Sequence, residues 1–146
     1  MHNLFNHIKK YIKIILFSIL SLFFVSSSQA ELTVEEIVKS RQALFSKNYS
    51  TAKRVQAFSS KGDFEKAKKL MIEMSENYKV LLDLFPENTE DEFDTGALPT
   101  VWEEKDAFNA LMTKASDDMI KLTSVIEDAE DIRGTLKQFM WSNCKA

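Results

Sequence analysis

The sequence contains few of the side chains on which most catalytic and metal sites depend. Its 146 residues include two histidines and one cysteine. Both histidines, His2 and His7, lie within residues 1–30, which we expect to be removed after export. A mature chain without histidine and with one cysteine excludes Ser-His-Asp and Cys-His catalytic sites, and zinc sites that need histidine or several cysteines. The single cysteine, Cys144, also excludes a disulfide within the chain.

Long hydrophobic runs are missing as well, apart from one short run near the N-terminus. Three lysines give residues 1–30 a positively charged start, and an apolar run follows over residues 14–25. Ser28-Gln29-Ala30 then supplies small residues for cleavage. A membrane anchor would need about 20 apolar residues, so a secretory signal peptide is the better interpretation. We expect an exported, periplasmic mature chain that forms a single domain over residues 31–146.

The mature chain would also have no excess of positive charge. Loss of the three N-terminal lysines changes the formal net charge from −3 to about −6. No basic stripe remains that could bind nucleic acid or an anionic membrane surface. We therefore expect neither nucleic acid nor, after signal cleavage, a membrane as a partner.

Alternating apolar and polar runs are absent, and apolar residues recur at helical spacing instead. Thr33 and Glu36 predict a capping box at the start of the first helix. The apolar stripe of this helix includes two polar residues, Arg41 and Asn48. Gly62 is typical of the helix end that follows.

A second helix is predicted over residues 64–85, with Asp63 as its N-cap and Pro86 as its end. Its methionines are interpreted as core residues rather than metal ligands. An irregular segment with several carboxylates follows over residues 86–99. It lacks the ligand spacing and glycine turn of a calcium loop, so we expect a solvated crossover loop. Loops of this length sometimes border a site.

Two further helices complete the pattern. Residues 100–103 read as a second capping box, and an apolar stripe continues to residue 126. The acidic turn over residues 127–131 favours the start of a fourth helix, which Gly134 weakens by up to about 1 kcal/mol. Four amphipathic helices in a chain of this length predict an all-α fold, an antiparallel up-down four-helix bundle.

The end of the sequence carries half of a known attachment signature. A cysteine followed by two residues begins Cys-x-x-Cys-His, in which two thiols bind the haem vinyl groups and the histidine binds the iron. By itself this half motif is almost no evidence for haem, because most lone cysteines are small buried hydrophobic residues and Cys144 alone is better interpreted as one.

Several short motifs together resemble those of a known family, the exported cytochromes c'. The likeness extends from about Glu35 to Ala146. It depends on four segments in this order: Val38-Lys39-Ser40-Arg41-Gln42-Ala43-Leu44-Phe45, Leu84-Phe85-Pro86, Ala97-Leu98-Pro99-Thr100-Val101-Trp102 and Asn143-Cys144-Lys145-Ala146. The family folds as four-helix bundles that hold haem at one end.

The resemblance implies a set of haem-binding residues. Cys144 matches the first thioether cysteine, while Arg41 and Gln42 match positions beside the haem, where the arginine can pair with a propionate. Phe45 matches the apolar residue that covers the open face of the iron, and Thr95 lies where the family's loop passes the haem edge. On composition alone, Arg41 is equally a surface arginine whose apolar stem packs on the helix.

The resemblance also implies a function. It predicts a non-enzymatic protein with haem c that passes single electrons or binds nitric oxide and carbon monoxide, together with a redox partner. A homodimer through the first two helices is a further candidate partner, which belongs with the haem-free alternative below. No residue of this chain is predicted as a metal ligand, because the family's second cysteine and axial histidine would follow Ala146. We expect the sequence to be a fragment that ends inside the motif. The alternative is a true stop and a haem-free exported bundle that acts as a structural or binding module.

Overall fold

The computed structural model describes residues 32–90, 93 and 95–143, so the predicted signal peptide and Cys144 lie outside the described residues. The described part of the chain is helical and contains no strand. Its elements are α2 (Val34–Ser59), α3 (Phe64–Leu81), the 3₁₀ helix η1 (Glu87–Thr89), α4 (Thr100–Glu103), α5 (Lys105–Val125), α6 (Ile132–Leu136) and the π-helix η2 (Lys137–Trp141). The predicted all-α fold is confirmed.

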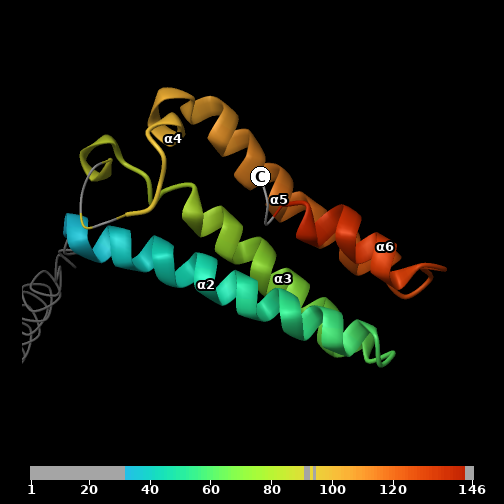
Figure 1. Ribbon diagram of the computed structural model, residues 1–146. Coiled ribbons are helices and arrows are strands. Elements are labelled where there is room, and N and C mark those ends of the chain that lie inside the picture. The colour runs from blue at the N-terminus through green and yellow to red at the C-terminus, as the bar shows by residue number, and fades with distance from the viewer. Residues whose placement is uncertain (1–31, 91–92, 94, 144–146) are drawn as a thin grey trace, which may run out of the picture. The chain divides into compact units, whose positions relative to one another are not determined.

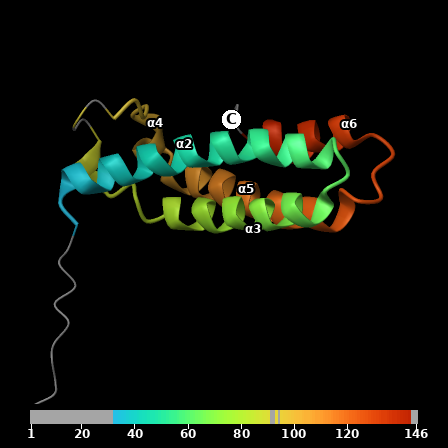
Figure 2. The same ribbon diagram turned by 90° about the horizontal axis from the view of Figure 1, so that it is seen from below.

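Successive helices of the bundle run in opposite directions (Figures 1 and 2). Helix α2 packs against α3, α3 packs against α5, and η2 packs against α5. The start of the last helix, α6, also contacts α2. This arrangement confirms the predicted antiparallel four-helix bundle. No helix in the described part of the chain combines the length and the apolar character needed to cross a bilayer.

The first two helices begin as the sequence predicts. The Thr33 amide donates to the Glu36 carboxylate at 2.8 Å, and the Glu36 amide donates to the Thr33 hydroxyl at 3.3 Å. Gly62 has a φ of 75°, which glycine adopts without the steric cost of a side chain. Asp63 then accepts a hydrogen bond from the Lys66 amide at the start of α3. Local chemistry alone therefore sets this hairpin.

Helix α3 ends four residues earlier than predicted, at Leu81 rather than at Phe85. Beyond Leu81 the backbone amides bond to the carbonyl three residues back instead of four, as in a 3₁₀ helix. The Leu82 amide donates to the Lys79 carbonyl and the Leu84 amide to the Leu81 carbonyl, each at 3.2 Å. Proline disfavours a helical conformation in the residue before it, so Pro86 excludes Phe85 from the helix. The early end turns Phe85 into the bundle, where it is 4% exposed.

The predicted capping box at residues 100–103 is wrong. A helical turn has already begun at Leu98, whose carbonyl accepts from the Val101 amide at 3.0 Å. Thr100 is therefore inside the first turn, where its side chain cannot act as the N-cap. Helix α4 ends at Glu103, and Glu104 leaves the helical conformation with φ −114° and ψ 46°. The predicted third helix is thus two helices, α4 and α5.

The core lies between α3 and the helices on either side of it. Met71, Met74 and Met119 are fully buried, as expected of core methionines. One polar pair crosses this apolar core: the hydroxyls of Ser75 on α3 and Ser116 on α5 are 2.8 Å apart and both residues are buried. Each hydroxyl satisfies the other, so the pair is compatible with burial.

The last helix changes from an α-helix to a wider π-helix at Lys137. The Ser142 amide donates to the Lys137 carbonyl, five residues back, at 3.1 Å. The wider turn keeps Met140 fully buried and lets the Trp141 indole donate to the Gln56 side chain on α2 at 3.1 Å. A π turn thus fits the end of the chain against two helices.

Gly134 supports the start of this helix rather than simply weakening it. Its amide donates to the Asp131 carboxylate at 2.9 Å, and a Cβ at position 134 would lie 2.3 Å from the other carboxylate oxygen. Alanine gains up to about 1 kcal/mol in helix propensity but displaces a cap that contributes about 1 kcal/mol. We expect Gly134→Ala to give no net stabilisation in urea unfolding.

The matched control for this prediction is Gly134→Ala made in a protein that already carries Asp131→Ala. With the cap already removed, Gly134→Ala should stabilise the protein by about 0.5–1 kcal/mol. A single Gly134→Ala variant that is more stable than wild type by that amount would show that the contact with Asp131 has no energetic consequence.

Candidate functional site

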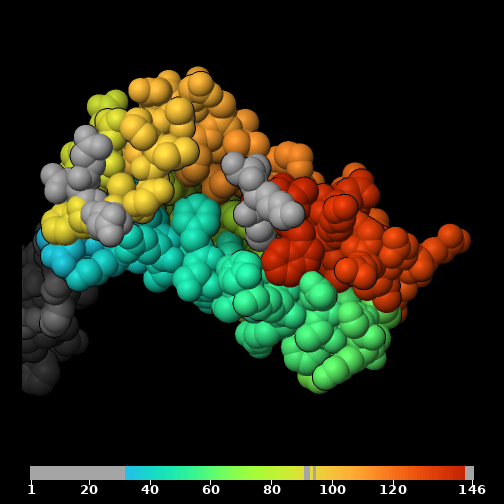
Figure 3. All heavy atoms as spheres, in the orientation of Figure 1, coloured from blue at the N-terminus to red at the C-terminus, as the bar shows by residue number. Residues whose placement is uncertain are grey.

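A cavity of about 490 Å³ opens between α2, α3 and the α4–α5 corner. This volume is within the range of small-molecule and cofactor sites. In the space-filling view, the yellow and orange surface of α4 and α5 stands beside the cyan surface of α2 (Figure 3). The walls are mostly aromatic and aliphatic, and Glu104 is their only aspartate or glutamate among the described residues. No lysine or arginine of the described chain lines the cavity.

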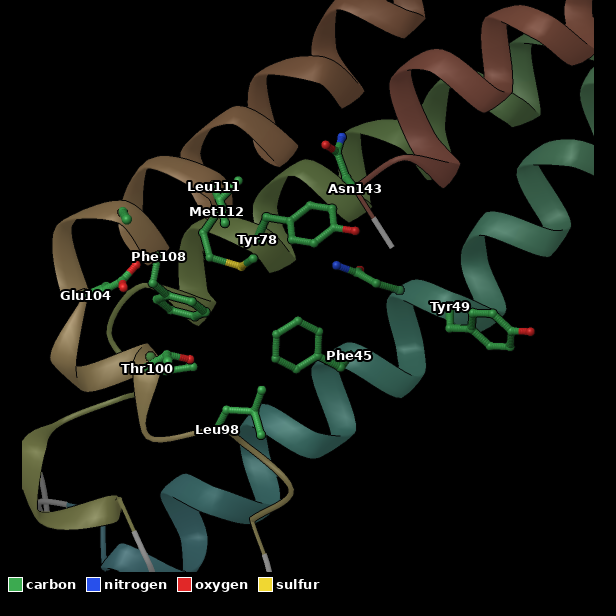
Figure 4. A pocket seen from close by; sticks show the side chains of 13 residues that line it. Phe45, Tyr49, Tyr78, Leu98, Thr100, Glu104, Phe108, Leu111, Met112 and Asn143 are labelled. Carbon is green, nitrogen blue, oxygen red and sulfur yellow. The ribbon is translucent and has the colours of Figure 1, made fainter. Parts of the chain in front are cut away.

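Side chains from three helices converge on the cavity (Figure 4). Phe45 of α2, Tyr78 of α3, and Phe108 and Met112 of α5 point toward a common space. Tyr49 lies at the edge, and its ring contacts Trp141 with 6.2 Å between ring centroids. The helical spacing of these residues predicts that they face inward, but it does not distinguish a cavity wall from a packed core.

The structure places Phe45 in the cavity wall with 39% of its surface exposed. Gln42, one turn before it on α2, is exposed and is not among the lining residues. Arg41 and Thr95 do not line the cavity either. The roles that the resemblance gives these four residues toward haem stay predictions.

Arg41 is not a surface arginine, because it is only 2% exposed. Its Nη1 donates to the Leu84 carbonyl at 3.2 Å and to the Thr89 hydroxyl at 2.8 Å. Its Nη2 donates to the Thr89 carbonyl at 3.0 Å and to the Thr95 hydroxyl. Burial lowers the pKa of the guanidinium from its ordinary value. A propionate partner for Arg41 would compete with these neutral acceptors for the guanidinium donors.

The segment over residues 86–99 is therefore more than a solvated loop. Thr89 is fully buried, and its hydroxyl also donates to the Pro86 carbonyl at 2.8 Å. The Trp102 indole donates to the same carbonyl at 3.0 Å. Arg41 and Trp102 thus tie both sides of the segment to the end of the bundle. The sequence did not predict this packing of residues 86–99, because the carboxylates in the segment suggested that it is fully exposed.

Phe85 is the centre of an aromatic cluster behind the cavity. Its ring centroid lies 4.7 Å from that of Phe108, 5.9 Å from that of Trp102 and 6.4 Å from that of Phe45. The Arg41 guanidinium carbon lies 4.6 Å from the same centroid, a cation–π contact. Because Phe45 and Phe108 line the cavity, Phe85 supports two of its walls from behind.

Lys105 adds a second positive charge beside this cluster. Its amine donates to the Phe85 carbonyl at 2.9 Å. Burial, and then the nearby charge of Arg41, lower the pKa of the Lys105 amine, while Asp83 has a smaller opposing effect. Among the described residues, the two cations contact carbonyls, hydroxyls and aromatic rings, and neither of them forms an ion pair there.

Asn48 is the most buried polar residue in the cavity wall, with 2% of its surface exposed. Its Oδ1 accepts a hydrogen bond from Asn77 Nδ2 at 2.8 Å. Its own Nδ2 has no hydrogen-bond partner among the described residues. The sequence marks Asn48 as a polar residue in an apolar stripe, but it does not show that the Nδ2 group of its side chain has no partner among the described residues.

Asn143 holds the end of the described chain at the cavity rim. Its Nδ2 donates to the Asp118 carboxylate at 3.0 Å and to the Phe139 carbonyl at 2.7 Å. The Lys114 amine approaches its Oδ1 at 3.4 Å. Asn143 lines the cavity and directly precedes Cys144 in the sequence. The described chain therefore reaches the cavity one residue before the predicted attachment residue.

Comparison with known proteins gives one match. A family model described as Cytochrome C' matches residues 36–146. No curated protein and no solved structure matches the chain. The matched range covers most of the chain, including the described bundle from the first turn of α2 onward and Cys144.

Proposed function

The chain belongs to the cytochrome c' family of c-type haem proteins, and from this premise we propose that its haem occupies the cavity beside Phe45 and is attached through Cys144. The observation that carries the proposal is that Asn143, the residue before Cys144, lines an apolar cavity. We further propose that the protein transfers single electrons or binds small neutral gases. The family is typically periplasmic, which agrees with the predicted signal peptide.

The residues of the cavity fit a porphyrin. Aromatic and aliphatic side chains from three helices form its walls, and these can pack on both faces of a planar macrocycle. The orphaned Nδ2 of Asn48 shows that the cavity wall still has a hydrogen bond to give. Haem iron with one axial position open exchanges single electrons and binds small gases. Which of these it does depends on the polarity of the pocket over that position and on how easily a ligand can enter.

The chain's own residues have distinct parts in this proposal. Phe108, Met112 and Tyr78 exclude water from the cavity, and Phe45 screens its open side against large ligands. Asn143 holds the segment that leads to Cys144 against α5. No enzymatic reaction is part of this proposal.

The test is whether the protein, produced from its own gene in cells that attach c-type haem, carries the pigment covalently. We expect a Soret band that stays with the polypeptide after acid–organic extraction and a haem stain at its position on a denaturing gel. Added carbon monoxide should shift the band of the reduced protein. A colourless, folded helical protein would contradict the proposal and favour the haem-free module, which the family match does not favour.

A further inference from the structure

The starting observation is the unused hydrogen-bond donor in the cavity wall. Buried polar groups nearly always have a partner, and those that do not usually mark a bound molecule or a functional role. Asn48 is 2% exposed, its Nδ2 has no partner among the described residues, and the residue lines the cavity. Asn77 fixes the other end of the amide through its hydrogen bond to Oδ1. The side chain is therefore held in place while the two N–H donors of its Nδ2 have no partner among the described residues.

The surroundings of this donor limit what can accept its hydrogen bond. Asn48 follows Phe45 by one helical turn, so the two side chains lie on the same face of α2. The opposite walls are apolar, with Phe108 and Met112 on α5. The described lining residues include a carboxylate, Glu104, and no lysine or arginine. The described lining residues therefore offer an anionic acceptor no positive partner beside Asn48, and a small neutral molecule fits this position better.

We propose that Asn48 donates a hydrogen bond from Nδ2 to a small neutral ligand held beside Phe45, and so sets which gases the cavity prefers. The inference rests on the proposed function, because it places this ligand in the haem cavity. Among gases of similar size, the donor favours those with a good acceptor atom, such as nitric oxide, over those that bind through apolar contacts alone. Asn77 is a positioning residue, since it acts through Asn48.

The experiment compares haem-loaded wild type with Asn48→Leu. Leucine has the same branched shape as asparagine but no donor, so nitric oxide should dissociate roughly 2- to 12-fold faster, which corresponds to one neutral hydrogen bond. The infrared stretching frequency of carbon monoxide held in the cavity should rise, because a donor near its oxygen lowers that frequency.

The matched control is Asn109→Leu. Asn109 lies on α5, outside the cavity lining, and its Oδ1 is also buried without a partner among the described residues. This variant should leave both the dissociation rate and the stretching frequency unchanged. The double variant Asn48→Leu/Asn77→Leu controls for folding, because the single change leaves Asn77 Nδ2 without its acceptor. We expect its haem-free form to unfold at a temperature no lower than that of wild type.

The outcomes separate this inference from the proposed function. A haem-loaded Asn48→Leu variant with an unchanged frequency and dissociation rate overturns the inference and leaves the proposed function standing. Weaker haem retention with an unchanged frequency assigns the donor to the porphyrin edge, and it also overturns the inference. A wild-type protein that takes up no haem overturns both.

Discussion

Replacing Arg41 with alanine should lower the free energy of unfolding by about 3–5 kcal/mol. The guanidinium makes four hydrogen bonds to residues 84–95 and stacks on Phe85 at 4.6 Å. Alanine removes these contacts and leaves a void at the end of the bundle. The buried Thr89 hydroxyl keeps its bond to Pro86, but the Thr89 carbonyl loses its donor. Chemical denaturation of the purified protein measures the change.

The control is Arg54→Ala, which removes an exposed arginine from the same helix. That variant should differ from wild type by less than about 0.5 kcal/mol. Arg41→Lys should recover only part of the loss, because a single ammonium cannot reach the acceptors of both Nη1 and Nη2 at once. Equal stability of the Arg41 and Arg54 variants would show that the buried contacts contribute nothing.

Replacing Phe85 with alanine should cost about 3–5 kcal/mol in the free energy of unfolding. The side chain is 4% exposed and its ring contacts those of Phe45, Phe108 and Trp102. Because two of these rings line the cavity, their loss of support should also weaken the binding of whatever occupies it. Urea unfolding measures the first effect, and haem retention, taken as the fraction of the purified protein that carries covalent haem, measures the second.

Phe93→Ala is the matched control, since Phe93 is 52% exposed in the same loop region. It should leave stability within about 0.5 kcal/mol of wild type and haem retention unchanged. Phe85→Leu keeps most of the apolar volume and should cost less than about 1.5 kcal/mol. A Phe85→Ala protein that loses stability but retains haem as wild type does would show that the cavity walls hold without this ring.

The helices could be predicted because their signals are local. The stripes of apolar residues, the capping pair Thr33 and Glu36, and the turn at Gly62 all act within a few residues of one another. The errors occurred where a neighbouring proline changed the local geometry. Pro86 keeps Phe85 out of α3, which ends at Leu81, and Pro99 is already in the helical conformation before Thr100, so Thr100 does not cap the turn.

The site could be predicted only in part, because its contacts join distant segments. Arg41 and Asn48 stand out in the sequence as polar residues in an apolar stripe, and both prove to be buried. Their partners are 48 and 29 residues away at Thr89 and Asn77, and no periodic pattern identifies such pairs. The stripe also does not reveal that Phe45 faces a cavity while Val38 on the same helix is packed.

The hydroxyl pair of Ser75 and Ser116 gives the bundle a fixed alignment. If α3 slid along α5 by one helical turn, about 5.4 Å, both hydroxyls would face apolar side chains and lose their only internal bond. Apolar contacts alone tolerate such slippage. The serine pair does not, because a shift of α3 along α5 breaks its hydrogen bond and costs free energy. The same register sets Tyr78, one turn beyond Ser75, across from Met112, one turn before Ser116. The polar bond between α3 and α5 thereby helps to select which side chains of these two helices meet at the cavity.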